Sequence, residues 1–206
     1  DRTSRGLGDV YKRQVRGLEE LIDYQGYPVR AAERATKARR SLGVGFIGLA
    51  HYLAKIGCKY GDPKALQSVH DLTESFQYYL LKASNEIAKE KGACEAFSHT
   101  KYSDGILPID TYKKDVDELV PNNLTYDWET LRTSILQHGL RHSTLSAQMP
   151  SESSSVVSNA TNGVEPPRGY LSIKKSKKGP LKQVVPQYTY LTVSYTHLRA
   201  HETYDH

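Results

Sequence analysis

The sequence predicts an α/β fold that is mostly helical and has a β-hairpin near its C-terminal end. Three observations predict it: an apolar stretch at residues 41–57, a long helical pattern at 62–92, and a change after residue 140 to short segments in which apolar and polar residues alternate. The chain has 206 residues, of which 38% are hydrophobic. One large domain or two small ones can therefore form a core.

The N-terminal part of the pattern is helical. Residues 18–24 predict a short helix, and residues 28–41 predict a basic helix or turn made of good helix formers. Residues 41–57 predict a mostly buried helix. This stretch contains a GxGxxG pattern that begins at Gly43 and ends at Gly48. No strand is predicted before it and no βαβ unit with an acidic residue about 20 positions on follows, so close helix packing is favoured over a dinucleotide site.

Three further helices are predicted. Residues 62–92 form a long helix with good start and stop residues and a core-facing stripe of aromatic and aliphatic side chains. Residues 107–119 and 127–140 predict two more helices, for which Asp110 and Asp127 are candidate caps.

The last part of the pattern is β-rich. Residues 141–149 are rich in Ser and Thr and have apolar residues at every second position, which favours a strand. A β-hairpin follows, with Tyr170 to Ile173 and Leu181 to Val185 as its arms around the lysine-rich turn KKSKKG. Helices therefore dominate until a β-rich end.

The two ends of the chain differ from the rest. Residues 1–14 and 192–206 carry no helical or strand periodicity that joins onto their neighbours. Both resemble the peptides that appear when sequencing-adaptor DNA is translated, so we assign them as non-native ends. Residues 15–191 remain for the interpretation of the fold.

Histidines in the C-terminal end would by themselves suggest a zinc site. His197 and His201 are four residues apart, with Glu202 adjacent and His206 beyond. The pattern lacks the glutamate directly after the first histidine that serves as general base in zincins, and it lies wholly inside the non-native end. We therefore predict no metal site.

Composition narrows the class of partner. The formal net charge is +5, but the basic residues are scattered among acidic ones, which favours a phosphorylated small molecule over nucleic acid. No stretch is long and apolar enough for a membrane span and no signal peptide is apparent, so we expect a soluble, cytoplasmic protein. Cys58 and Cys94 form no CxxC motif, and we expect both to be reduced and structural.

The serine-rich stretch 149–169, MPSESSSVVSNATNGVEPPRG, is the strongest local candidate for a site. It follows the predicted strand 141–149, and Pro150 fixes its exit direction. Residues 151–155 could open a short helix whose free amides and serine hydroxyls would bind an anion. Simple helix capping or a linker is the alternative. The dense turn formers that follow favour a loop of fixed shape.

Several stretches resemble the large (α) subunit of class I ribonucleotide reductase, of the aerobic bacterial type that reduces ribonucleoside diphosphates. They are LPIDTYKKDVD, YDWETLR, HGLRHSTLSAQMPSESSSVVSNATNGVEPPRGY and LKQVVPQY, with YYLLKASNEIAKEKGAC and LEELIDYQGYPV further upstream. The resemblance runs from about Val15 to Leu191 and covers about a quarter of the family's large subunit. It therefore identifies the chain as an internal fragment.

The resemblance implies a fold and a substrate site. The family fold is a ten-stranded α/β barrel of two five-stranded halves, and this chain resembles part of the second half. The family's substrate diphosphate-binding motif falls on PSESSS, where Glu152, Ser153 and Ser154 match the phosphate-binding positions. Ser151, Ser155 and Arg168 are supporting candidates. Ser153 stands where a threonine is common, which keeps the hydroxyl.

The resemblance also implies an activity and its partners. The family is an oxidoreductase that replaces the ribose 2'-hydroxyl by hydrogen through a cysteine radical. It implies a ribonucleoside diphosphate substrate, a homodimer of large subunits, and a small (β) radical-generating subunit with a diiron-tyrosyl radical. ATP and dNTP effectors and thioredoxin or glutaredoxin as reductant are implied for the parent protein. We expect no cofactor, membrane or nucleic acid to be bound by this fragment.

The fragment lacks the chemical residues of the family. The radical cysteine lies in an Asn-x-Cys-x-Glu motif that this sequence does not contain, and Cys58 and Cys94 match neither that cysteine nor the redox pair. We therefore expect no catalytic residue in this chain and no activity of the chain alone, which would expose sheet edges and apolar helix faces. The alternative function is a nucleic-acid-binding module that uses the lysine-rich hairpin, although no aromatic residues interleave with its lysines.

Overall fold

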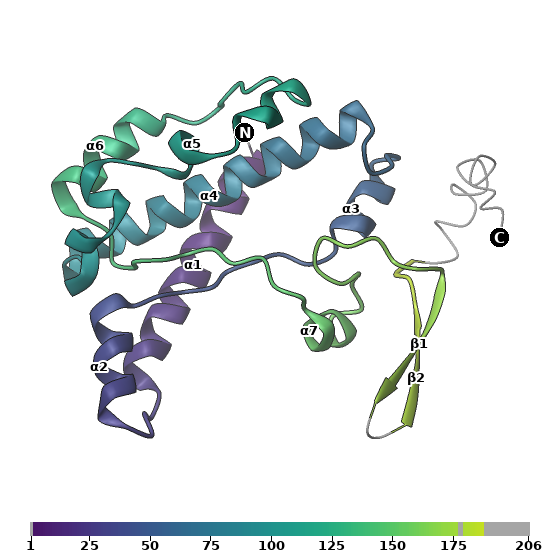
Figure 1. The fold of residues 1–206 in the computed structure, drawn as a ribbon, viewed down its shortest axis with the longest axis horizontal. Coiled ribbons are helices and arrows are strands. Elements are labelled where there is room, and N and C mark those ends of the chain that lie inside the picture. The colour runs from purple at the N-terminus through teal and green to yellow at the C-terminus, as the bar shows by residue number, and fades with distance from the viewer. Residues whose placement is uncertain (1, 177–178, 188–206) are drawn as a thin grey trace. The chain divides into compact units, whose positions relative to one another are not determined.

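A computed structural model describes residues 2–176 and 179–187 of the chain (Figure 1). The helices are α1 (Arg2–Tyr24), α2 (Arg30–Arg39), α3 (Leu49–Lys55), α4 (Pro63–Lys91), α5 (Pro108–Thr111), α6 (Trp128–His138) and α7 (Glu152–Val157), with 3-10 turns η1 (Glu95–His99), η2 (Lys101–Asp104) and η3 (Lys114–Glu118). The strands are β1 (Leu171–Ser176) and β2 (Gly179–Val184).

Two compact units are present: unit 1 is Asp1–Val44 with Gln67–Ala147, and unit 2 is Gly45–Leu66 with Gln148–His206. Among the described residues, no helix combines the length and apolar character of a membrane span.

Helix α4 confirms the long helix predicted at 62–92. Pro63 occupies its first position, where a missing amide hydrogen does no harm. Gly92 follows its last residue with a φ of 85° and donates its N–H to the Ala88 carbonyl at 2.8 Å. Most of the predicted stripe is buried, namely Phe76, Leu80, Ala83 and Ile87. Its other members are half-buried.

Polar side chains on the same helix fix the position of α6. The Glu74 carboxylate accepts hydrogen bonds from the Trp128 indole at 3.0 Å and from the Thr125 amide at 2.8 Å. The Asn85 side chain donates to the Gly139 carbonyl at 2.9 Å and accepts from the Ser134 hydroxyl at 2.6 Å. Both ends of α6 are therefore tied to α4 by buried hydrogen bonds.

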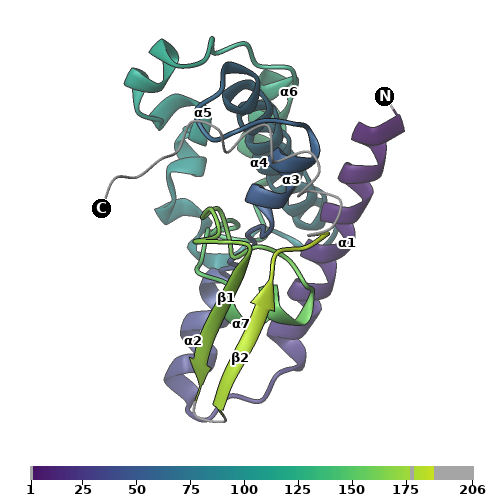
Figure 2. The same cartoon turned by 90° about the vertical axis from the view of Figure 1, so that its right-hand side faces the viewer.

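Helix α1 includes most of the N-terminal end. In the sequence, residues 1–14 show no helical periodicity that joins onto their neighbours, but in the structure residues 2–14 continue the predicted helix 18–24 toward the N-terminus. Figures 1 and 2 show α1 lying against α4, and the Tyr11 ring packs edge-on against Phe76 with centroids 5.4 Å apart. Tertiary contact with α4 stabilises this segment as a helix.

The predicted helix at 41–57 is wrong in its first half. Within this stretch, residues 41–48 lie outside any helix, and only α3 is helical. Val44 pairs with Ser146 in a parallel bridge, and its N–H donates to the Leu145 carbonyl at 2.9 Å. The strand predicted at 141–149 is present only as this bridge. A short apolar run fits a buried strand as well as a buried helix, and here a partner about a hundred residues away decides between them.

The helix predicted at 107–119 is also wrong, because the segment forms the short helix α5 and the 3-10 turn η3. Asp110 caps the start of α5 by accepting the Leu107 N–H at 2.7 Å. Helix α6 confirms the prediction at 127–140: Asp127 accepts the Thr130 N–H at 3.0 Å at its start, and Gly139 ends it. Helices thus dominate unit 1 as predicted.

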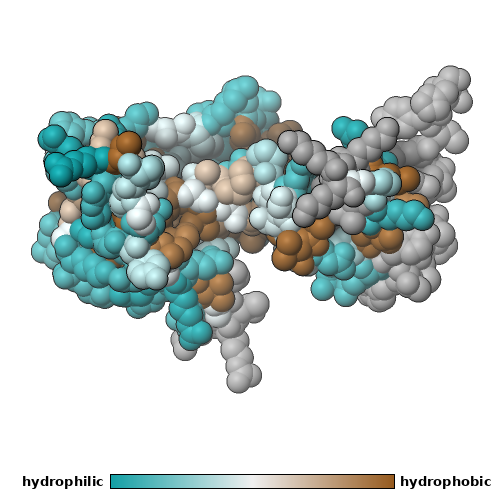
Figure 3. Space-filling model, turned by 90° about the horizontal axis from the view of Figure 1, so that it is seen from below, coloured by the Kyte–Doolittle hydropathy of each residue, from teal (hydrophilic) through white to brown (hydrophobic). Residues whose placement is uncertain are grey.

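Unit 2 contains α3, α7 and the hairpin. Together with the helices of unit 1, these elements confirm the prediction of a mostly helical chain with a β-hairpin near its end. β1 and β2 pair antiparallel, with Leu171 opposite Val184 and Ile173 opposite Lys182 (Figure 2). Lys177 and Lys178 of the predicted turn lie outside the described residues. The apolar side chains of one hairpin face are exposed, and Figure 3 shows hydrophobic residues at several places on the surface. Cys58 and Cys94 are buried and free, as expected.

Candidate functional site

The serine-rich stretch forms a short helix, α7, as predicted. Ser151 precedes it, and the Ser151 carbonyl accepts the Ser155 N–H at 2.9 Å as the first helical hydrogen bond. The Ser151 hydroxyl does not cap the helix, because it donates back to the Met149 carbonyl at 3.1 Å. Among the described residues, the amides of Glu152, Ser153 and Ser154 therefore have no hydrogen-bond acceptor.

Burial divides the predicted site residues into two sets. Glu152, Ser153 and Ser154 are exposed, and no hydrogen bond of their side chains occurs among the described residues. Ser151 and Ser155 are buried, and the Ser155 hydroxyl donates to the Glu152 carbonyl at 3.0 Å. The three matched positions therefore face solvent, while two of the supporting candidates hold the turn from inside.

The loop after α7 has a fixed shape, as its turn formers predicted. Asn162 accepts the Ser151 N–H through its side-chain oxygen at 2.8 Å, and Ala160 donates its N–H to the Ser155 carbonyl at 2.8 Å. Gly163 has a φ of 47°, and a Cβ there would lie 3.3 Å from the Met149 carbonyl oxygen. The loop thus folds back onto the residues that precede α7, so the first turn is supported from both sides. Asn162 was missed by sequence reasoning.

The same loop is attached to the start of α3. Gly48 donates its N–H to the Thr161 carbonyl at 2.9 Å, and Leu49 donates to the Gly163 carbonyl at 3.3 Å. Gly48 has a φ of 81°, which glycine adopts without strain. The prediction of close helix packing for the GxGxxG glycines is therefore wrong: Gly43 lies before the helix, and Gly48 allows the turn into α3.

Arg168 is exposed between the loop and β1. Among the described contacts, none joins its side chain to α7. The structure therefore brings together Ser151 to Ser155, but it does not bring the third supporting candidate into the cluster.

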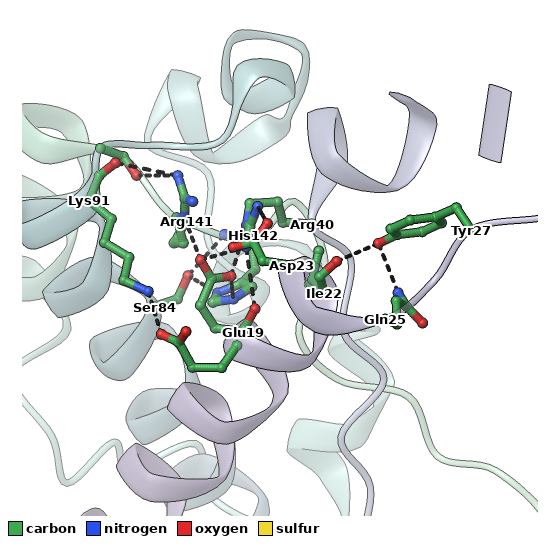
Figure 4. Close-up of polar contacts among 12 residues, drawn as sticks. Glu19, Ile22, Asp23, Gln25, Tyr27, Arg40, Ser84, Lys91, Arg141 and His142 are labelled. Carbon is green, nitrogen blue, oxygen red and sulfur yellow. Dashed lines mark hydrogen bonds and ion pairs between the residues drawn. The ribbon is translucent and has the colours of Figure 1, made fainter. Parts of the chain in front are cut away.

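A second polar cluster, in unit 1, was not predicted from the sequence. Figure 4 shows Arg40, Arg141 and His142 pointing at the carboxylate of Glu19. Arg40 Nε donates to Glu19 Oε2 at 2.8 Å, Arg141 Nε donates to Oε1 at 2.7 Å, and His142 Nε2 lies 3.0 Å from Oε2. Asp23 is a second partner of the Arg40 guanidinium, at 2.6 Å. Glu19, Arg40 and His142 are all buried.

In this Glu19 cluster, burial and hydrogen bonding have opposite effects on the pKa values of the ionisable groups. Burial opposes ionisation of Glu19, but hydrogen bonds from His142, Arg40 and Arg141 outweigh it and hold the pKa of this carboxyl below its ordinary value. Burial lowers the pKa of His142 although Glu19 favours its charged form. The Ser84 hydroxyl accepts the His142 backbone N–H at 3.2 Å and lies 2.9 Å from Nδ1. This arrangement fits a neutral imidazole that accepts from Ser84 and donates from Nε2 to Glu19.

One signal in the sequence could have found this cluster. Val15, Glu19 and Ile22 follow helical spacing, and all three are buried. A carboxylate in an apolar stripe of a helix requires partners, since an unpaired buried charge is costly.

No group of three or more His, Cys, Asp or Glu side chains that could hold a metal occurs among the residues that the structure describes. His197, His201 and His206, the histidines of the C-terminal pattern, lie outside that part of the chain.

Comparison with known proteins gives the same family as the sequence motifs. The family model described as the ribonucleotide reductase barrel domain matches residues 2–204. The chain is 61% identical over 181 residues to the ribonucleoside-diphosphate reductase subunit alpha of Haemophilus influenzae, with 88% of this chain and 24% of that protein covered. It is 61% identical over 174 residues to ribonucleoside-diphosphate reductase 1 subunit alpha of Escherichia coli, with 84% and 23% covered.

The subunit alpha of bacteriophage T4 is similar as well, at 51% identity over 180 residues, 87% of this chain and 24% of the phage protein. The chain thus spans about a quarter of the length of the curated relatives that it matches. None of these matches supports the nucleic-acid-binding alternative.

Proposed function

The chain belongs to the ribonucleotide reductase barrel-domain family, and on this premise we propose that it is an internal part of the catalytic large subunit of a ribonucleoside-diphosphate reductase. Residues 15–191 are the proposed native fragment, and residues 1–14 and 192–206 are the proposed non-native ends. The parent enzyme reduces ribonucleoside diphosphates to 2'-deoxyribonucleoside diphosphates by radical chemistry. This fragment supplies the loop that binds the substrate diphosphate.

One observation carries the assignment of the loop. The first turn of α7 presents three amides for which the described part of the chain holds no acceptor, together with the exposed hydroxyls of Ser153 and Ser154. Buried Ser151 and Ser155 hold this turn in place. A helix start with converging N–H donors favours an oxygen-rich anion such as a diphosphate.

The charge of Glu152 limits its role. A carboxylate repels a phosphate, so we assign the phosphate contact at this position to the backbone amide. The exposed Glu152 side chain can then point away from the anion or accept a hydrogen bond from a hydroxyl of the substrate. Ser153 and Ser154 donate from both amide and hydroxyl, which makes them the principal phosphate contacts.

These residues position the substrate and take no part in bond breaking. Contacts with the diphosphate, far from the reacting ribose, contribute binding energy that holds the ribose in register with the radical cysteine of the parent protein. That cysteine, the redox cysteines and the effector sites are proposed to lie in the parts of the subunit beyond this chain. A small subunit with a diiron-tyrosyl radical, a second large subunit, and thioredoxin or glutaredoxin complete the proposed parent system, in the cytoplasm.

The test is a chimaeric full-length subunit in which residues 15–191 replace the equivalent stretch of the Haemophilus influenzae relative. Replacing Ser153 and Ser154 together by alanine should raise KM for CDP by at least about 100-fold, because each charge-assisted hydrogen bond contributes about 1.5–3 kcal/mol and about 1.4 kcal/mol corresponds to tenfold in affinity. The value of kcat should change much less. Ser158→Ala is the matched control, an exposed serine at the other end of α7. Equal effects of the double variant and the control on KM would refute the assignment.

A further inference from the structure

Unit 1 contains a cleft of about 420 Å³ that the proposed function does not use. It lies where the paired segments around Val44 and Ser146 begin, because Ser41, Ser143 and Thr144 line it together with Arg39 at the end of α2. Residues of η1 and η2 form another part of its wall, and the residues that begin α5 form the rest. The cleft has the size of a pocket for a small molecule, for which about 300–1,000 Å³ is typical.

The polar groups of the cleft are mostly hydrogen-bond donors. Arg39 and Lys101 are exposed basic residues, and His99 is a further member of the lining. Among the residues that the structure describes, neither Arg39 nor Lys101 has an ion-pair partner. No Asp or Glu occurs among the described lining residues. The cleft therefore presents uncompensated positive charge.

Hydroxyl groups add donors between the cations. The Ser41 and Ser143 hydroxyls lie 2.9 Å apart, so one of them donates a hydrogen bond to the other. The proton of the accepting hydroxyl remains available for a ligand. Tyr102 also lines the cleft, and its phenol is a further donor. These donors come from three separate segments of unit 1, so a ligand that accepts from all of them must carry several oxygens in a compact group.

The remaining wall is apolar. Ile106, Leu107 and Pro108 line the cleft beside the Tyr102 ring. A bare inorganic ion would leave this surface in contact with water, whereas an organic group attached to the anion would cover it.

We propose that this cleft binds a phosphorylated small molecule, with Arg39 and Lys101 holding the phosphate oxygens and the apolar wall covering the attached organic group. Arginine is suited to bidentate contact with phosphate, and lysine adds a point charge that neutralises the second negative charge. The site differs from the serine turn of α7, since it is built entirely from residues of unit 1.

The experiment is isothermal titration of the 206-residue chain and of the chimaeric subunit with AMP and with inorganic phosphate. We expect saturable binding of both, tighter for AMP than for phosphate alone because of the apolar wall. Replacing Arg39 and Lys101 together by alanine should weaken binding by at least about tenfold. The matched control replaces Arg34 and Lys89 by alanine, which removes the same charge from exposed positions of α2 and α4 outside the cleft.

Three outcomes of these titrations would overturn the proposal. The first is equal loss of binding in the double variant and the charge-matched control, which would show only a general electrostatic effect. The second is absence of saturable binding in the chimaeric subunit, since the cleft would then be an internal surface of the whole protein. The third is binding whose NMR shift changes map to residues 151–155 instead of 99–102.

The Ser153→Ala/Ser154→Ala variant separates this proposal from the proposed function. It should leave AMP binding at the cleft within about twofold while KM for CDP rises. If the serine variant lost AMP binding and the Arg39/Lys101 variant kept it, the cleft proposal would fail and the diphosphate loop would stand.

Discussion

In unit 1, the Glu19 carboxylate is 1% exposed and receives hydrogen bonds from Arg40, Arg141 and His142. In unit 2, the side chains of Ser153 and Ser154 are exposed and make no hydrogen bond among the described residues. Both regions are rich in polar groups. Those of unit 2 are close together in the sequence, whereas those of unit 1 are far apart in it. They differ in whether those groups are already satisfied by the protein.

This difference separates stability from binding. A carboxylate that is fully paired inside the protein has no hydrogen-bonding capacity left for a ligand, and its removal takes an ion-pair partner from the buried cations around it. An exposed serine or a free amide at a helix start loses little when mutated in the absence of ligand, because water replaces its partner. Perturbing Glu19 should therefore change folding, and perturbing Ser154 should change binding.

The largest expected effect is that of Glu19→Ala. The free energy of unfolding should fall by about 3–5 kcal/mol, because Arg40, Arg141 and His142 lose their common acceptor inside the protein. Glu20→Ala is the control: Glu20 is the next residue of α1, is exposed and pairs with Lys91, and an exposed ion pair contributes about 0–1 kcal/mol. Chemical denaturation followed by Trp128 fluorescence measures the free energy of unfolding of both variants. A similar loss in the two variants would contradict the structural role of the cluster.

A smaller effect is expected from pH. The pKa of His142 is lower in the folded protein than its ordinary value of 6.5, so the unfolded chain binds a proton first as the pH falls. Stability should therefore decrease below about pH 6.5, by about 1.4 kcal/mol for each pH unit until the folded pKa is reached. Glu19 and Asp23 have lowered folded pKa values, so their contribution is present above their ordinary values and is lost as the pH falls further.

Urea unfolding at pH 7, 6, 5 and 4 measures this dependence. His142→Gln should flatten the part between pH 6.5 and 5, while His138→Gln, at an exposed position at the end of α6, should leave it unchanged. If wild type and His142→Gln lose stability in parallel over this range, the buried imidazole is not the group that titrates.

The two regions also differ in how far sequence could predict them. The start of α7 is a local feature, because Pro150, five serines and the turn formers after them lie within about twenty residues. The exposure of Ser153 and Ser154 follows from that local helix. The partners of Glu19 lie 21, 122 and 123 residues away. Only the folded chain brings them together.

The same distinction explains the errors in the predicted fold. Helix α4 and the cap of Asp127 on α6 depend on neighbouring residues and were predicted. The extended segment at Val44 depends on Ser146, and helix α1 before residue 15 depends on contact with α4. Periodicity could not determine either, since tertiary contacts override a weak local preference.

The smallest expected effect compares two serines of the same turn. Ser155→Ala removes the fully buried hydroxyl that donates to the Glu152 carbonyl, so the free energy of unfolding of the chimaeric subunit should fall by about 1 kcal/mol. Ser154→Ala removes an exposed hydroxyl, and the change should stay within about 0.5 kcal/mol. CDP binding should respond in the opposite order, since only Ser154 faces the proposed diphosphate. If Ser155→Ala weakened CDP binding more than Ser154→Ala at equal folding, the buried serine would be the ligand contact, and the division between supporting and binding residues in this turn would be wrong.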